Sequence, residues 1–228
     1  MSGSDADRWA ATAAALPTAE RAGRERPFWQ ALIAAWGWRR VADAGCGAGF
    51  HLALLRGLGV EATGFDLAVA ALPRGVAAVA GDLLAPPLRP GAFDAALCLG
   101  NTISLLPGRA GQQRALASLA ALVRPGGVVL VQGEDAGAIV AAGPVARTRA
   151  LADGRVHVRL FEKRGRLVRM LAGVVRPGEQ AALEPGWLLP TQPADLERLA
   201  GRLGLEAVPL PARAPGGGPT FWLALRRL

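Results

Sequence analysis

The chain lacks tyrosine entirely, and its 228 residues include only two cysteines, two histidines and one lysine, Lys163. Two cysteines at unrelated positions, Cys46 and Cys98, are too few for a disulfide framework or a zinc site, so we expect both to be small packing residues. No apolar run approaches the ~18 residues of a membrane span, and the N-terminus has no signal-peptide pattern. These absences predict a cytoplasmic protein with no metal site and no membrane contact.

The positive charge of the chain is carried almost wholly by arginine, and the net charge is +8 at pH 7. Because alanine, glycine and proline are also abundant, this composition is typical of a GC-rich coding sequence more than of a surface that binds nucleic acid. No motif of the recurrent RNA-binding modules is present. We therefore do not expect nucleic acid as a partner, and the 51% of hydrophobic residues is ample for one packed core.

Short apolar segments alternate with helical segments through the first 133 residues. The helical repeat at 28–36 follows Pro27, which suits a first helical turn. Alternation of this kind predicts right-handed strand–helix–strand units and a parallel sheet. The predicted strands are 39–45, 60–66, 75–82, 93–100 and 128–133. The predicted helices are 28–36, 50–59, 67–74 and one that begins at 111 and is stopped by Pro125 and Gly126.

The remaining chain has a different pattern. Two alternating runs within 155–175 predict an antiparallel hairpin that turns near 163–165. A helix is expected at 191–204 with Thr191 as its N-cap, followed by strands at 205–210 and 220–228. The link before the last strand is too short for a crossover helix, so that strand should run antiparallel. The pattern predicts an α/β, Rossmann-like sheet of seven mostly parallel strands, with helices on both faces and an added hairpin.

The stretch "DAGCGAG" (43–49) places three glycines at alternate positions, two residues after Asp43. It joins the first predicted strand to the first following helix, at the sheet edge where open α/β folds bind ligands. Missing side chains let a ligand contact the backbone, and the helix N-terminus favours negative groups. Phe50 occupies the sixth position of the G-x-G-x-x-G dinucleotide fingerprint, so a nicotinamide cofactor is not expected. His51 is predicted to be a packing or surface residue of the helix.

The motif at 43–49 resembles the first motif of class I S-adenosylmethionine-dependent methyltransferases. Asp66, "GDLL" (81–84), "FDAALCLGNTISLLP" (93–107) and "LVRPGGVVLV" (122–131) resemble the family's later motifs, in order. The resemblance implies transfer of a methyl group from S-adenosylmethionine by in-line displacement, with S-adenosylhomocysteine as product. It also implies four segments: a helical cap (1–40), a cofactor-binding core (41–131), a lid or substrate insertion (132–190) and a C-terminal helix and strand pair (191–228).

The same resemblance implies a role for individual residues toward the cofactor. Asp66 is expected to accept hydrogen bonds from the ribose hydroxyls, and Arg21, with Arg24 as its competitor, to bind the carboxylate. Trp9 is expected either to cover the cofactor or to be a core residue. The full set implied for the cofactor is Trp9, Arg21, Asp43, Gly45, Cys46 and Gly47, then Asp66 and Leu67, Asp82 and Leu83 at the adenine, and Leu99 and Gly100 behind the sulfonium.

The stretch "CLGNTISLLP" (98–107) resembles glycine and sarcosine N-methyltransferases, which implies that Asn101 contacts the acceptor. Where those enzymes place an arginine for the substrate carboxylate, this chain has Glu134. A carboxylate on the acceptor would be repelled there, so we expect a neutral or amine-bearing small molecule. His157 and Arg159 share one hairpin face and are predicted to line the acceptor pocket with Asn101 and Glu134. Asn101 and His157 are the catalytic candidates, because His157 is the one side chain expected near the site with an ordinary pKa suited to proton removal.

Two other classes of function stay open from the sequence. The hairpin carries Arg155, Arg159, Arg164, Arg166 and Arg169, which suit phosphate contacts in an RNA or protein methyltransferase. A non-catalytic S-adenosylmethionine-binding protein is the third class. Nothing in the sequence indicates the oligomeric state, the pathway or the identity of the acceptor.

Overall fold

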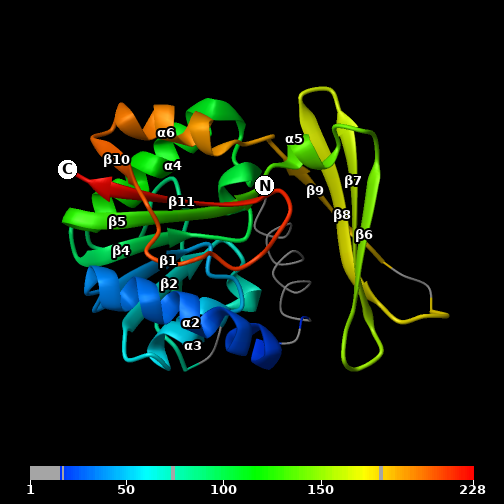
Figure 1. Cartoon of the computed structure of the whole chain (residues 1–228), viewed down its shortest axis with the longest axis horizontal. Helices are drawn as coiled ribbons and strands as arrows, with labels where there is room; N and C mark the ends of the chain where they lie inside the picture. The colour runs from blue at the N-terminus through cyan, green and yellow to red at the C-terminus, as the bar shows by residue number, and fades with distance from the viewer. Residues whose placement is uncertain (1–15, 17, 73–74, 180–181) are drawn as a thin grey trace.

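The computed structural model describes residues 16, 18–72, 75–179 and 182–228, which form a seven-stranded sheet beside a separate four-stranded sheet (Figure 1). The order of the larger sheet is β10-β11-β5-β4-β1-β2-β3. Strand β11 is antiparallel to both of its neighbours, while the pairings among β5, β4, β1, β2 and β3 are parallel, as predicted. Its strands are β1 (Arg40–Ala44), β2 (Glu61–Asp66), β3 (Ala78–Ala80), β4 (Phe93–Cys98), β5 (Val123–Glu134), β10 (Leu205–Val208) and β11 (Thr220–Arg227).

Helices cover both faces of this sheet (Figure 1). On one face lie α2 (Thr18–Trp36) and α3 (Phe50–Arg56), which bury Trp29 and Leu52 against the strands. On the other lie α4 (Gly108–Leu122) and α6 (Pro193–Gly201), which bury Leu119 and Leu196 in a second cluster. Within the described residues, no helix is long and apolar enough to cross a membrane. The short elements are η1 (Val69–Ala71), η2 (Thr102–Leu105) and α5 (Ala136–Ile139).

Four predicted helix boundaries were wrong. Helix α2 begins at Thr18, so Pro27 lies inside it; the buried side chains of Phe28, Trp29 and Leu32 offset the backbone hydrogen bond that proline removes. Helix α4 ends at Leu122, and the next residue already pairs with β4. Helix α3 ends at Arg56, with Gly57 as its C-cap, rather than at residue 59. Of the helix predicted at 67–74, the described residues form only the single turn η1.

The predicted cap of the last helix was also wrong. The N-cap of α6 is Gln192, and its side chain makes no capping hydrogen bond. Thr191 is instead fully buried, where its hydroxyl donates to the carbonyl of Leu189 and accepts from the side chain of Gln112. The hydroxyl therefore links the chain leaving the four-stranded sheet to α4.

The second sheet, called here the small sheet, has the order β6-β7-β8-β9. The predicted hairpin forms its centre as β7 (Val156–Arg164) and β8 (Leu167–Val175), and it turns within two residues of the predicted position. The outer strands β6 (Val145–Ala150) and β9 (Glu184–Leu188) were not predicted. Phe161, Met170 and Leu188 pack with α5 in a core of their own.

Candidate active site

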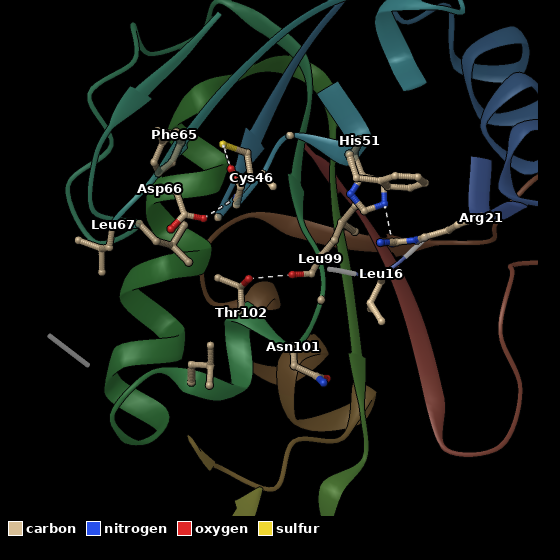
Figure 2. A pocket seen from close by; sticks show the side chains of 18 of the residues that line it. Leu16, Arg21, Cys46, His51, Phe65, Asp66, Leu67, Leu99, Asn101 and Thr102 are labelled. Carbon is tan, nitrogen blue, oxygen red and sulfur yellow. Dashed lines mark hydrogen bonds between the residues drawn. The ribbon is translucent and has the colours of Figure 1, made fainter. Parts of the chain in front are cut away.

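A cavity of about 920 Å³ lies at the carboxyl ends of β1, β2 and β4. It is bounded by the loops that follow these strands and by the small sheet. Its walls include residues 45–51, 65–67, 81–84 and 99–102 from the larger sheet's loops. The small sheet contributes His157, Arg159, Met170 and Ala172 to the cavity wall. The face of the small sheet that carries these four residues is called here its inner face. In Figure 2, Asp66 and Leu67 lie on the left, Arg21 and His51 on the right, and Asn101 below. Open α/β sheets bind ligands at this edge.

The glycine loop (residues 45–49) places bare backbone against the cavity. The amides of Gly45 and Cys46 both donate to the carbonyl of Phe65, at 2.9 and 3.2 Å, which ties the loop to the end of β2. Gly45 has φ +79°, and a Cβ there would lie 2.9 Å from the side chain of Thr102. A Cβ on Gly47, also at positive φ, would meet nothing within 4 Å. The loop thus needs glycine for its conformation and, at Gly45, for close packing.

The Asp66 carboxylate is held rigidly at the cavity wall. Its Oδ2 accepts from the amide of Gly47 at 2.7 Å, and its Oδ1 accepts from the amide of Ala68 at 2.8 Å. Each carboxylate oxygen retains acceptor capacity after one such bond. The group therefore fits a ligand that presents two neighbouring hydroxyls, as a ribose does.

Next to Asp66 the wall becomes apolar. Leu83 and Phe65 line the cavity, and Leu67 beside them is partly exposed. Asp82 also lines it, and its Oδ1 accepts from the amide of Leu84 at 2.8 Å, while no bond to its Oδ2 forms among the described residues. This part of the wall suits a flat ligand ring, which would lie between the apolar side chains and donate a hydrogen bond from its edge to Asp82.

On the side of the glycine loop opposite to Asp66, the buried carboxylate of Glu25 holds Arg21. Glu25 accepts from Nε of Arg21 at 2.7 Å and from Nε1 of Trp29 at 3.3 Å. Burial raises the pKa of Glu25, but His51 and Arg21 outweigh it and hold that pKa at about 2. The guanidinium lies 3.9 Å from the centre of the Phe50 ring. Arg21 lines the cavity, whereas Arg24 pairs with exposed Glu20 away from it.

Asp43 lies behind the glycine loop rather than on the cavity wall. It is 1% exposed, and its Oδ2 has no hydrogen-bond partner among the described residues. Burial, with a further contribution from the negative charge of Asp66, raises its pKa to about 6, although His51 and Arg21 act in the opposite direction. Its direct contact with a cofactor stays a prediction. Trp9 lies outside the described residues.

Asn101 joins the cavity wall to the end of β5. It has φ +71° and is the one non-glycine residue with positive φ in the described part of the chain. Its Oδ1 accepts from the amide of Glu134 at 2.6 Å, and its Nδ2 donates to Oε2 of Glu134 at 3.2 Å. The preceding residue, Gly100, donates its amide to the side chain of Gln132 at 2.7 Å. The loop after β4 is therefore fixed by polar groups of β5.

Glu134 is enclosed by arginines from the small sheet. Its Oε1 lies 3.0 Å from Nη1 of Arg147, and its Oε2 lies 2.5 Å from Nη1 of Arg159. The carboxylate is 5% exposed and does not itself line the cavity. Because two guanidinium groups face this one negative charge, Glu134 gives no net repulsion on which to base the expected exclusion of a carboxylate from the acceptor, and the charge of the acceptor stays a prediction. The sequence did not show that Arg147 lies near Glu134.

Comparison with known proteins relates this site to a protein family and to solved structures with the same fold. The model of a family described as a methyltransferase domain matches residues 42–131. The chain contains a methyltransferase domain. Its fold is that of class I S-adenosylmethionine-dependent enzymes. No curated protein sequence matches the chain.

Solved structures with the fold of this methyltransferase include the CcbJ methyltransferase from Streptomyces caelestis, at 25% identity over 90% of each chain with a TM-score of 0.72. An amino pentose methyltransferase from Micromonospora echinaspora is 22% identical over 94% of this chain and 93% of its own, with a TM-score of 0.65. A sugar N-methyltransferase from a Streptoalloteichus species is 22% identical over 90% of this chain and 87% of its own, with a TM-score of 0.66.

Two histidines line the cavity of the methyltransferase, not His157 alone as expected. Burial, together with Arg159 and Arg149, lowers the pKa of His157 to about 4, so its imidazole is neutral near pH 7 and weakly basic. Nε2 of His51 lies 3.2 Å from Nη2 of Arg21 and 3.5 Å from Oε2 of Glu25, so its tautomer decides whether it accepts from the arginine or donates to the glutamate. The sequence signal for His51 was its position two residues after Gly49, in the first turn of α3.

Proposed function

We propose that this methyltransferase transfers the methyl group of S-adenosylmethionine to a nitrogen or oxygen of a small organic acceptor, held between the glycine loop and the small sheet. The observation that carries the proposal is the Asp66 carboxylate, which is fixed by two backbone amides at 2.7 and 2.8 Å and retains acceptor capacity toward the cavity. A cavity of about 920 Å³ lies near the upper end of the range for ligand pockets, so it has room for a donor and a small acceptor.

The donor site follows the wall from Asp66 to Arg21. Asp66 would accept from the ribose hydroxyls, while Asp82 and Leu83 would bind the adenine edge and Leu67 would cover the ring. The backbone of Gly45, Cys46 and Gly47 would lie against the methionine part. Arg21, oriented by Glu25, would pair with the donor's carboxylate, and Leu99 with Gly100 would lie behind the sulfonium. Burial raises the pKa of the Cys46 thiol, which suits a neutral packing role there.

The acceptor site is proposed to lie between Asn101 and the inner face of the small sheet. When bound, S-adenosylmethionine supplies an electrophilic methyl group on a positively charged sulfur. A lone pair of the acceptor attacks the methyl carbon as the bond from that carbon to sulfur breaks, so the residues here have mainly to align the acceptor. Asn101 and the small sheet, which lies within the predicted lid segment 132–190, would exclude water, and neutral His157 would accept a proton where the acceptor carries one.

An amine acceptor has the most support. Two of the structures with this fold are named as an amino pentose methyltransferase and a sugar N-methyltransferase. Both names describe small polar acceptors, which the enclosed and partly polar cavity suits. Their identities of 22% carry the fold, so the acceptor class for this chain rests on the cavity and awaits direct measurement.

The basic hairpin gives little support to RNA as the acceptor. Arg159 pairs with Glu134 and points into the cavity, and Arg155 and Arg164 pair with Asp153 and Glu162. An exposed groove for a phosphate backbone needs unpaired cations in a row. The arrangement therefore favours a small molecule enclosed by the sheet.

Two measurements test the proposal. Calorimetric titration with S-adenosylhomocysteine should show binding in the micromolar range, about −8 kcal/mol. Incubation of the protein with methyl-labelled S-adenosylmethionine and fractionated metabolites should then yield a labelled small molecule, identified by mass. Absence of binding, or label that appears only in RNA or protein, would contradict the proposal.

A further inference from the structure

We propose that the acceptor carries an anionic group, a carboxylate or a phosphate, that binds the guanidinium of Arg159 with Arg149 beside it. The inference rests on the proposed function, because it concerns the acceptor end of the same cavity. It reverses the expectation drawn from Glu134 in the sequence, and the contacts around that residue are the reason.

The inner face of the small sheet gathers basic groups from two paired strands. Arg147 of β6 lies directly across from Arg159 of β7, and Arg149 lies directly across from His157. Residues opposite each other in antiparallel strands project to the same face of the sheet. Because His157 and Arg159 line the cavity, Arg147 and Arg149 are on its side as well. These three arginines are called here the arginine cluster.

Only one carboxylate balances the arginine cluster. Glu134 pairs with Arg147 and Arg159, and among the described residues no other acidic side chain forms an ion pair with any of the three arginines. Arg149 is exposed and forms no ion pair in this part of the structure. Like charges placed directly opposite each other destabilise a sheet, and Glu134 offsets this only in part. Positive charge therefore remains at the acceptor end.

The two ends of the cavity differ in charge. Asp66 and Asp82 lie at the donor end, where the proposal assigns them to ribose and adenine. At the acceptor end, burial and then the charges of Arg159 and Arg149 lower the pKa of His157, so this residue is neutral and adds no charge there. The side chains of Arg159 and Arg147 remain 29% and 33% exposed after pairing with Glu134. Their remaining donors are thus available to an anion of the acceptor.

Glu134 has a distinct part in this arrangement. Its carboxylate accepts from the side-chain Nδ2 of Asn101, and it thereby connects the loop beside the donor site to the arginines of the small sheet. It therefore positions Arg159 at a fixed distance from the loop that the proposed sulfonium site adjoins. An acceptor held through its anion by Arg159 would have its reacting atom set relative to the methyl group.

The experiment is calorimetric titration of the protein saturated with S-adenosylhomocysteine, using matched probes. One series is propylamine, β-alanine and aminoethyl phosphate; another is glucosamine, glucosaminic acid and glucosamine phosphate. Within each series the amine without an acidic group has a carboxylate and a phosphate counterpart, so the two arms distinguish the anions. Wild type is compared with Arg159→Met, with Arg149→Met, which leaves Glu134 paired, and with the control Arg169→Met. Arg169 lies on the outer face, since it alternates with Met170 on the cavity wall.

We expect at least one probe with an acidic group to bind about ten-fold or more tightly than the matching amine without one, the scale of one charge-assisted hydrogen bond. That preference should be lost in Arg159→Met, weakened in Arg149→Met and kept in Arg169→Met. Equal binding of the probes with and without an acidic group in both series would overturn the inference. So would a preference that survives both inner-face substitutions. Failure of S-adenosylhomocysteine itself to bind, measured first, would instead contradict the proposed function on which the inference rests.

Discussion

The glycine loop and the small sheet line one cavity, but the chain builds these two walls in different ways. The first wall presents the backbone of the glycine loop and the fixed carboxylate of Asp66, and its hydrogen bonds join residues 45–47 to Phe65 and Asp66. The small sheet presents long cationic side chains that are set by a carboxylate 13 and 25 residues away in sequence. The first wall suits a ligand of constant shape, and the second suits recognition by charge. This division agrees with the proposed function, in which the first wall binds the methyl donor S-adenosylmethionine and the second binds the methyl acceptor.

The largest effect should come from the donor wall. Replacing Asp66 by alanine removes two acceptors for the ribose and the anchor of the Gly47 amide. With each charge-assisted bond worth ~1.5–3 kcal/mol, binding of S-adenosylhomocysteine should weaken by about 100-fold or more. Calorimetry measures this, with Asp153→Ala on the small sheet as control. If the affinity of Asp66→Ala for S-adenosylhomocysteine stays within a few-fold of wild type, Asp66 does not bind the cofactor.

The second effect concerns Asp43, whose pKa rises from 3.8 to about 6 in the folded protein. A carboxyl with a raised folded pKa stabilises the protein fully below its unfolded pKa and loses that contribution as pH rises through the folded pKa. The free energy of unfolding of wild type should therefore fall between pH 4 and pH 6 by on the order of 3 kcal/mol from this group.

Asp43→Asn should remove that fall, so its stability relative to wild type should increase across the same pH window. Urea unfolding without cofactor at pH 4, 5, 6 and 7 measures the difference. Parallel curves for the two proteins would show that Asp43 does not titrate as described.

The third effect tests the acceptor wall alone. Glu134→Gln and Asn101→Ala each break the link between the loop after β4 and the small sheet. We expect kcat/KM for the acceptor to fall about ten-fold, the scale of one hydrogen bond to a charged group, with cofactor affinity within a few-fold. Steady-state kinetics measures kcat/KM for the acceptor, and calorimetry measures cofactor affinity, so together they separate the effects on the two walls. Loss of cofactor binding in both variants would mean that the walls are not independent.

The smallest effect should come from His157. Since its folded pKa is about 4, it is uncharged across the neutral range, and no ionisation of this residue should appear in kcat/KM between pH 6 and 8. His157→Asn should keep the shape of the wild-type pH profile, with a rate reduced by less than about five-fold. A step near pH 6.5 that disappears in this variant would show an ordinary pKa and a larger catalytic part.

The same contrast explains what the sequence could predict. Asp66, Asp82 and the glycine loop stand at strand ends, so strand order and local motif were enough to anticipate their place at one edge. The hairpin and the antiparallel last strand followed from alternation and from a short link. The surroundings of Glu134 did not follow, because Arg147 reaches it from β6, a strand of arginine and small residues with weak strand signals. His51 was similarly missed, since Arg21 and Glu25 meet it only after α2 packs on α3.

The most direct test of the central claim is a crystal structure of the protein with S-adenosylhomocysteine. We predict ribose hydroxyls within about 3 Å of both oxygens of Asp66, the adenine against Leu83, and the carboxylate at Arg21. The sulfur should face Asn101, with the guanidinium of Arg159 turned toward the remaining space. A ligand bound with its adenine toward Arg159, or outside this cavity, would contradict the account.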